Sequence, residues 1–243
     1  MILRRGDNSA RRRDEPPVRV KLLSEHPDKP IVSHKTAEAT RPAALGDVLF
    51  RSMTRDPFYT IGHSTRSVSA FAALLQQAEV QLIVDVRSIP RSRANPQFNR
   101  ETLPASLQFY HIDYEHVAAL GGLRGRQRLS AASLNGFWDN DSFRNYADYA
   151  LTADFRRGLI RLRELGESRR TCIMCAEAVW WRCHRRIIAD YLIAAGDHVF
   201  HIMGEGKIER ATITLGARLT PEHGLIYPPA GERKIGGTAS SPK

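Results

Sequence analysis

The chain has 243 residues, a length that suits one ordinary domain with additional ends and excludes an array of several domains. Hydrophobic residues make up 42% and charged residues 26%, and no run of 18 or more apolar residues occurs, so the sequence predicts no membrane-spanning helix. The formal net charge is +10, and 30 of the 36 basic residues are arginine. An Arg-rich chain fits nucleic acid or phosphorylated ligands, whereas GC-rich coding would produce the same ratio without a functional meaning. The positions of the arginines must therefore decide between these two interpretations.

The two ends of the sequence differ from its middle. Residues 1–57 contain 12 basic and 8 acidic residues, six prolines and no sustained apolar period, which predicts a disordered arm. The basic start lacks an apolar segment, so it does not resemble a targeting peptide. Residues 221–243 are expected to form a flexible tail, and residues 58–220 to form the folded domain.

Short apolar runs alternate with helical periods inside this domain. Phe58–Ile61 is predicted as a strand, Ser67 or Ser69 as the cap of a helix, and Leu82–Val86 as a second, buried strand. Phe109–Asp113 is predicted as a third strand after a proline-containing loop. A long helix capped by Asp141 or Ser142 is expected to run to about Leu165.

The remaining elements complete the alternation of strands and helices. Thr171–Cys175 is predicted as a fourth strand, Trp181–Ala195 as a helix ending at Gly196, and His198–Ile202 as a fifth strand. This order predicts an α/β fold with a single open, mostly parallel sheet of about five strands and helices on both faces.

Ligands of open α/β sheets bind where the carboxyl ends of the strands meet, so the polar residues after each strand are the candidates for a site. Nine arginines lie in or beside the loops predicted at this edge, and they favour an anionic, phosphate-bearing ligand. Some of them, such as Arg126 and Arg186, are more simply explained as solvated residues on helix faces. The candidates for binding the ligand or its anion are Gly62, His63, Ser64, Asp85, Arg87, Arg91, Arg93, Arg124, Arg182 and Arg185.

Cys175 is the sharpest candidate for chemistry, because it ends a buried strand just before a loop and a helix. Rhodaneses and Cys-dependent phosphatases place their reactive thiol in this way, but the loop here lacks glycine and carries Glu177. A buried structural thiol is the alternative. Glu177 and His184 could instead form an acid/base pair, and the competing interpretation is an ion pair of Glu177 with Arg182 or Arg185.

A metal site is a further alternative, because Cys175, Cys183, His184 and His63 carry sulfur and nitrogen ligands. The spacing matches no common zinc ribbon or finger, and adjacent residues of a helix point about 100° apart. The sequence therefore favours no metal and leaves any cofactor unknown. The three cysteines, Cys172 included, lie within twelve residues and fit a reducing compartment, for which the cytoplasm is the expectation.

Four segments resemble one known family. These are Thr60-Ile-Gly-His-Ser64, the run Asp85–Arg93, Leu120-Gly-Gly-Leu123, and Cys175-Ala-Glu177 with the run Cys183–Leu192. They are similar to the bacterial and archaeal family catalogued as domain of unknown function 488, over roughly Phe58 to Thr220. The resemblance implies one α/β domain with these motifs gathered in one pocket, and it implies no reaction.

These observations lead to one main hypothesis and two alternatives. The main hypothesis is an enzyme with an Arg-lined anion pocket that acts on a phosphorylated, nucleotide-like or nucleic-acid-end substrate, with Cys175, Glu177 and His184 as its catalytic residues. The alternatives are a non-catalytic nucleic-acid-binding module, based on the net charge, and a structural or regulatory partner protein. The oligomeric state does not follow from the sequence.

Overall fold

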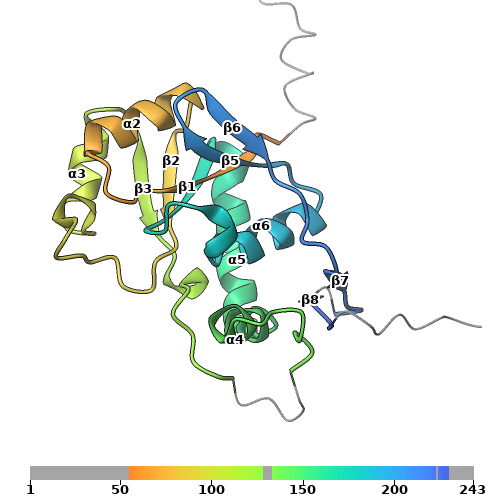
Figure 1. The fold of residues 1–243 in the computed structure, drawn as a ribbon. Helices are drawn as coiled ribbons and strands as arrows, with labels where there is room; N and C mark the ends of the chain where they lie inside the picture. The colour runs from red at the N-terminus through yellow and green to blue at the C-terminus, as the bar shows by residue number, and fades with distance from the viewer. Residues whose placement is uncertain (1–54, 128–132, 223, 230–243) are drawn as a thin grey trace, which may run out of the picture. The chain divides into compact units, whose positions relative to one another are not determined.

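A six-stranded sheet forms the centre of the protein in a computed structural model, which describes residues 55–127, 133–222 and 224–229 (Figure 1). The predicted N-terminal arm lies outside these residues except for 55–57, and so does the chain after residue 229. No helix in the described ranges combines the length and the apolar character that crossing a membrane requires.

The sheet is parallel except at one edge, as the alternating pattern predicts. Its spatial order is β3-β2-β4-β1-β5-β6, and the pairs among the first five strands are all parallel, whereas β6 pairs antiparallel with β5. The strands are β1 (Phe58–Gly62), β2 (Leu82–Asp85), β3 (Asp113–His116), β4 (Thr171–Cys175), β5 (Val199–Gly204) and β6 (Lys207–Arg210).

Helices cover both faces of the sheet, and each face has its own hydrophobic cluster. Helices α2 and α3 contribute to one cluster, and α4, α5 and α6 contribute to the other. In β4, Cys172 and Met174 point into the first cluster, while Ile173 and Cys175 point into the second. Both sides of this strand are thus buried, which explains its uninterrupted apolar sequence. The helices are α2 (Val68–Gln77), α3 (Leu103–Gln108), α4 (Asp141–Ala150), α5 (Ala153–Ser168) and α6 (Arg185–Ala194), with short 3-10 turns η1 (Pro96–Phe98), η2 (Ala118–Leu120) and η3 (Trp180–Arg182).

The third strand is displaced from its predicted position. Phe109, 84% exposed, caps the C-terminus of α3, and the chain turns at His111 with a φ of 58° before β3 begins at Asp113. The prediction of a strand over Phe109–Asp113 is therefore wrong. Helix α3 was not expected because its segment contains proline, but a proline in the first turn is compatible with a helix.

The long helix predicted from Asp141 is two helices. Helix α4 ends at Ala150, and Thr152 starts α5 by accepting a hydrogen bond from the backbone N–H of Phe155 at 3.4 Å. Asn140, rather than Asp141 or Ser142, caps α4. The three-and-four spacing continues through both helices because both pack on the same hydrophobic cluster.

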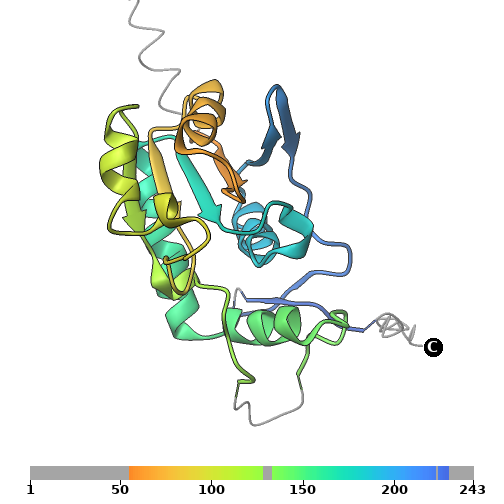
Figure 2. The same ribbon diagram turned by 60° about the vertical axis from the view of Figure 1, so that its left-hand side comes forward.

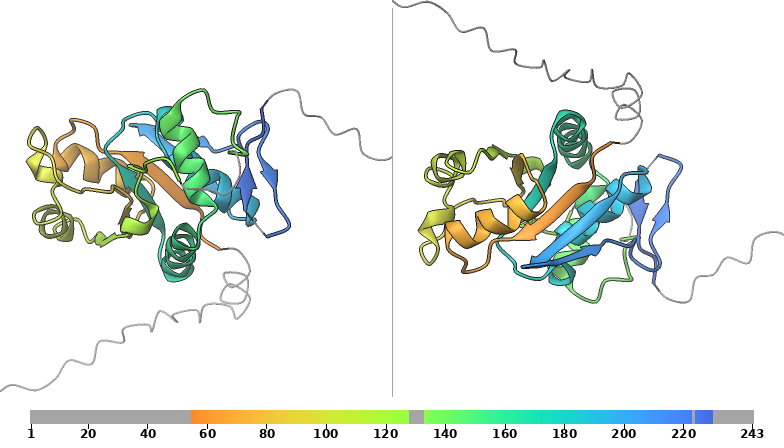
Figure 3. Two further views of the ribbon diagram at one scale, coloured as in Figure 1. Left: turned by 90° about the horizontal axis from the view of Figure 1, so that it is seen from below. Right: turned by 90° about the horizontal axis from the view of Figure 1, so that it is seen from above.

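The described residues beyond 220, which are 221–222 and 224–229, include a short strand. The short strands β7 (Arg218–Leu219) and β8 (Leu225–Ile226) pair with each other, and Tyr227 is fully buried and donates a hydrogen bond to Asp190 at 2.9 Å. Figures 2 and 3 show this pair on the side of the domain opposite α2 and α3. These contacts lie within the segment from 221 onward that the sequence assigned to a tail.

The connections of the central strands change direction at β4. The chain leaves β1 and β2 toward α2 and α3 on one face, whereas it leaves β4 toward α6 on the other face. A crevice for ligands is expected at such a point, outside the carboxyl ends of the strands. The segments that follow these three strands line the cavities described next.

Candidate functional site

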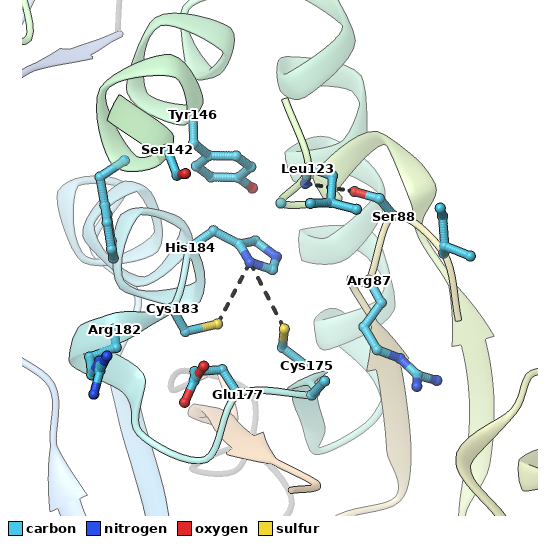
Figure 4. Close-up of a pocket in the computed structure, with 14 residues that line it drawn as sticks. Arg87, Ser88, Leu123, Ser142, Tyr146, Cys175, Glu177, Arg182, Cys183 and His184 are labelled. Atoms are coloured by element: carbon cyan, nitrogen blue, oxygen red, sulfur yellow. Dashed lines mark hydrogen bonds between the residues drawn. The ribbon is translucent and has the colours of Figure 1, made fainter. Parts of the chain in front are cut away.

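Two cavities lie at the carboxyl edge of the sheet. The first, about 310 Å³, is mostly apolar, and the second, about 430 Å³, is more polar. Both are lined by Arg87, Ile89, Ala176 and Glu177, so they adjoin each other along a shared wall. The first is also lined by Ser88, Gly122, Leu123, Ser142, Phe143, Tyr146, Cys175, Arg182, Cys183 and His184 (Figure 4), and the second by His63, Ser64, Thr65, Arg91, Ser92, Asn95 and Ala178.

Two thiols and an imidazole converge in the wall of the apolar cavity. The Nδ1 atom of His184 lies 3.6 Å from the Cys183 sulfur and 3.9 Å from the Cys175 sulfur, and all three atoms lie within 4.8 Å of one another. Figure 4 shows the imidazole between the sulfurs and the Tyr146 ring. This cluster joins the end of β4 to the start of α6.

The two thiols differ in acidity although both are buried. The adjacent Cys183 sulfur and burial raise the pKa of Cys175 well above its usual value. Burial alone would raise the pKa of Cys183 as well, but the hydrogen bond from Cys175 and the charge of Arg185 lower it well below that value. The Arg185 guanidinium, whose Nε lies 3.3 Å from the Cys183 sulfur, is thus a cause that favours the ionised form of Cys183.

A buried ion pair joins the end of β2 to the site. Arg87 donates from Nη2 to the Asp85 carboxylate at 2.6 Å and to the Phe98 carbonyl at 2.7 Å, and from Nε to Asp85 at 2.9 Å. Asp85 also accepts a hydrogen bond from the Tyr114 hydroxyl at 2.7 Å. Most donors of Arg87 are thus used within the protein, and its guanidinium points away from the two sulfurs in Figure 4.

His63 extends this network at the end of β1. Its Nδ1 lies 2.8 Å from the Ser64 carbonyl, and its Nε2 lies 3.2 Å from Nη1 of Arg87. Nδ1–H therefore donates to the carbonyl, and Nε2 accepts from Arg87, which is the neutral tautomer. Burial lowers the pKa of His63 to about 4, and its ring stacks on Phe98 at 4.2 Å.

Arg185 and Arg124 contact the protein itself. Arg185, 1% exposed, donates to the Cys183 sulfur at 3.3 Å, to the Glu177 carbonyl at 2.6 Å and to the Thr60 hydroxyl at 3.3 Å. Arg124 donates to the carbonyls of Gly121 and Ala118 and lies over the Tyr149 ring. Both hold loops in place, and neither lines the two cavities.

Three exposed side chains of the candidate set make fewer contacts. Within the described part of the chain, the guanidinium groups of Arg93 and Arg182 and the carboxylate of Glu177 have no hydrogen-bond or ion-pair partner. Arg182 and Glu177 line the cavities, whereas Arg93 lines neither of them. Arg91 has one ion pair, with the exposed Glu101 at 3.4 Å. The predicted pair of Glu177 with Arg182 or Arg185 is not formed between side chains, because Arg185 contacts only the Glu177 carbonyl.

Gly62 allows the loop after β4 to pass close to the end of β1. A Cβ at Gly62 would lie 1.9 Å from the Glu177 carbonyl oxygen. The role of Gly62 in this structure is therefore close packing beneath the site.

The sequence missed part of the apolar cavity. Cys183 was considered only as a metal ligand and was not chosen as a site residue, although its position beside His184 at a helix start was a visible signal. Leu123, Phe143 and Tyr146 come from a loop and from α4, and their sequence pattern indicates only ordinary core packing.

Comparison with known proteins identifies a family and no relative. The model of the family described as Domain of unknown function DUF488 matches residues 67–192, which is about half of the chain. No curated protein and no solved structure matches the sequence.

Proposed function

Since the chain belongs to the family described as Domain of unknown function DUF488, we propose a function from the geometry of its site: an enzyme that acts on a small, phosphorylated, nucleotide-like substrate. The observation that carries this proposal is the pair of adjoining cavities with opposite character at the carboxyl edge of a parallel sheet. Their volumes suit a small ligand with one apolar and one anionic part.

The apolar cavity suits a ring. Leu123, Phe143 and Tyr146 contribute apolar surface to it, and the hydroxyls of Ser88 and Ser142 are available for orientation at its wall. The Ser88 hydroxyl already accepts a hydrogen bond from the backbone N–H of Leu123 at 2.8 Å, which holds the wall in place. A planar base would bury its faces against these side chains, as aromatic ligand groups commonly do.

The polar cavity and the rim suit an anion. Ser64, Ser92 and Asn95 line the polar cavity together with Arg91, and Arg182 lines the apolar cavity next to the shared wall. Guanidinium groups bind phosphate through paired, charge-assisted hydrogen bonds. We assign the anion to Arg91 and Arg182, because both are exposed and line a cavity, whereas Arg87, Arg124 and Arg185 donate to groups of the protein itself.

The chemistry is assigned to the apolar cavity and to the wall that it shares with the polar one. Cys175 and His184 bring a thiol and an imidazole to the apolar cavity, and Glu177 brings a carboxylate to the shared wall. Groups of these types carry out acid/base and nucleophilic steps. Glu177 lines both cavities, and its carboxylate has no partner among the described residues, so it is the group with the freest access to a bound substrate.

Thermal shift and calorimetric titration of the full chain test the substrate class. Nucleoside monophosphates and diphosphates should raise the Tm, and free nucleosides or inorganic phosphate alone should do so much less. The Arg91→Gln and Arg182→Gln variants should each weaken binding about tenfold, because each loses a hydrogen bond to a charged group. Arg157→Gln, an exposed arginine on α5 paired with Asp154, is the matched control.

Two outcomes would contradict this proposal. One is the absence of any Tm increase with millimolar nucleotides, and the other is equal weakening by Arg157→Gln. Steeply salt-dependent binding of mixed oligonucleotides that is unchanged in the Arg91/Arg182 double variant would instead favour the nucleic-acid-binding alternative.

A further inference from the structure

Cys175, Cys183 and His184 place three metal-binding atoms together at the wall of the apolar cavity. Two sulfurs and the Nδ1 atom lie within 4.8 Å of one another. We propose that these three residues bind one Zn²⁺ ion, with the cavity on the side of the fourth coordination position. The inference adds a metal to the site of the proposed function, and metal binding itself requires no substrate.

The distances suit a tetrahedral zinc ion. With Zn–S bonds of about 2.3 Å and Zn–N bonds of about 2.0 Å, tetrahedral angles place sulfur and nitrogen ligands roughly 3.6 Å apart. The observed separations from Nδ1 are 3.6 Å to Cys183 and 3.9 Å to Cys175. Both Nδ1–sulfur separations are therefore within about 0.3 Å of the value for a shared tetrahedral ion.

The imidazole of His184 is held in the tautomer that a metal needs. Its Nε2 lies 3.0 Å from the Val86 carbonyl, so Nε2–H donates there and Nδ1 keeps its lone pair on the side of the sulfurs. Metal-binding histidines are commonly oriented by such a hydrogen bond from the second ring nitrogen. The Val86 carbonyl at the end of β2 thus performs this role.

Packing also fixes the ring of His184. Tyr146 contacts it edge-on with ring centres 5.0 Å apart, and the backbone of Gly122 packs closely against it. A Cβ at Gly122 would lie 2.4 Å from Nδ1 and 2.8 Å from two ring carbons. Gly122 therefore lets the loop approach the imidazole without displacing it.

Arg185 donates hydrogen bonds to both segments that carry the sulfurs. Its Nε donates to the Cys183 sulfur at 3.3 Å, and its Nη2 donates to the Glu177 carbonyl in the loop after Cys175. A single buried side chain thus positions both sulfur-bearing segments.

The local backbone removes the sequence argument against a shared ion. Cys183 ends η3 in extended conformation with φ −126° and ψ 144°, and α6 begins only at Arg185. Cys183 and His184 are therefore not consecutive residues of one helix, and the angle of about 100° does not apply to them. Their side chains converge because the chain changes direction between them.

The ligand set favours zinc and an exchangeable position. Two thiolates and one imidazole suit Zn²⁺ among the common divalent ions, and three protein ligands facing a cavity are the arrangement of catalytic rather than structural zinc. Bound there, zinc would supply Lewis-acid chemistry to the proposed enzyme. Cys175 and His184 would then act as ligands, and Glu177 would remain as the acid/base group.

Metal analysis of the full-length protein tests the inference without a substrate. Chelator-treated, reduced protein should take up one Zn²⁺ per chain in a competition titration with a chromophoric chelator. Co²⁺ in its place should give thiolate charge-transfer absorption and the strong visible bands of a tetrahedral site. Cys175→Ser, Cys183→Ser and His184→Asn should each weaken Zn²⁺ binding by at least about 100-fold, more than loss of a supporting residue costs.

Cys172→Ala is the matched control, because Cys172 is also a buried thiol of β4 but points to the opposite face of the sheet. It should bind Zn²⁺ as the wild type does. Equal loss in Cys172→Ala, or a wild type whose Co²⁺ spectrum lacks thiolate bands, would overturn the proposal. If a ligand variant fails to fold, the Co²⁺ spectrum of the wild-type protein alone still shows whether thiolates bind the metal.

The experiments can contradict the proposed nucleotide substrate and the proposed zinc site independently of each other. A protein that binds nucleotides but gives no specific Zn²⁺ uptake retains the proposed substrate and loses the metal. A protein that binds Zn²⁺ through these residues but no nucleotide retains the metal site and loses the substrate class.

Discussion

Arginines beneath the site and arginines on its rim occupy the same edge of the sheet but have different environments. Arg87 and Arg185 are 6% and 1% exposed, and their guanidinium groups donate to a carboxylate, to carbonyls and to sulfur within the protein. The side chain of Arg91 is 73% exposed, and Arg182 is also exposed. The number of donors that the fold already uses therefore separates arginines that position the site from arginines that are available to a ligand.

This difference also bears on whether the excess of arginine in the sequence has a functional meaning. The charge of Arg87 is paired with the Asp85 carboxylate, whereas Arg185 donates to uncharged acceptors, so its positive charge acts on the buried Cys183 beneath the cavities. The available charge at the edge is limited to the rim, where a substrate anion would bring the missing partner.

Arg87→Met should cause the largest loss of stability. It leaves the Asp85 carboxylate, which is fully buried, without its charged partner, and removing one member of a buried pair costs about 3–5 kcal/mol. Urea unfolding at neutral pH measures the effect. The double variant Asp85→Asn/Arg87→Met should be less destabilised than the single variant, and the reverse order would contradict a role for the buried pair.

Acidification should destabilise the protein through His201. Burial lowers the pKa of His201 to about 4, its Nδ1 contacts the Thr60 hydroxyl at 2.8 Å, its ring stacks on Trp180, and the charge of Arg185 acts in the same direction. The unfolded chain takes up this proton near pH 6.5 and the folded chain only near pH 4. Stability should therefore fall between these values, by about 3 kcal/mol at the lower end.

Comparison of two histidine variants isolates this effect. His201→Gln should reduce the dependence of the unfolding free energy on pH between 6.5 and 4 to about half, because it removes one of two buried histidines with a pKa lowered to about 4 and leaves His63 to titrate. His198→Gln, at an exposed position of the same segment, should leave the slope unchanged. Equal slopes in both variants would show that His201 does not carry the dependence.

Gly62→Ala should have an intermediate effect. The new methyl group would overlap the Glu177 carbonyl, so the loop after β4 must shift, and overpacking of this kind typically costs 1–3 kcal/mol. Gly125→Ala is the control, because a Cβ there meets nothing within 4 Å. Thermal unfolding of both variants measures the difference, and an unchanged Tm in Gly62→Ala would mean that the loop yields freely.

Arg182→Gln should change stability least. An exposed guanidinium without a partner in the described chain can be replaced within about 0.5 kcal/mol. The same variant should lose about tenfold in nucleotide affinity if the rim binds the anion. A large loss of stability with unchanged affinity would place Arg182 among the supporting residues instead.

Local sequence patterns predicted correctly the elements that depend on neighbouring residues, such as a buried strand and a helix cap. Thr171–Cys175 is continuously apolar apart from its threonine and has the bounds predicted for β4, and Ser67 caps α2 as its position before an apolar period indicates. The prediction of the third strand failed because Phe109 and Tyr110 favour a strand in isolation. In the structure Phe109 caps α3 and is exposed, and only Tyr110 packs against a hydrophobic cluster. The sequence did not predict the break between α4 and α5 at Thr152, because the apolar period continues across it.

Chain order also brought most of the site residues to one edge, since parallel strands end together. Chain order and local pattern thus suffice to predict an open, mostly parallel α/β sheet, the loops that meet at its carboxyl edge, and the thiol, imidazole and guanidinium groups that those loops carry. The packed fold is needed to see which arginines are buried with their donors in use, and that the Cys183 sulfur lies beside His184 and Cys175. Burial, pKa and hydrogen-bond partners depend on residues far apart in the chain, and no local pattern encodes those contacts.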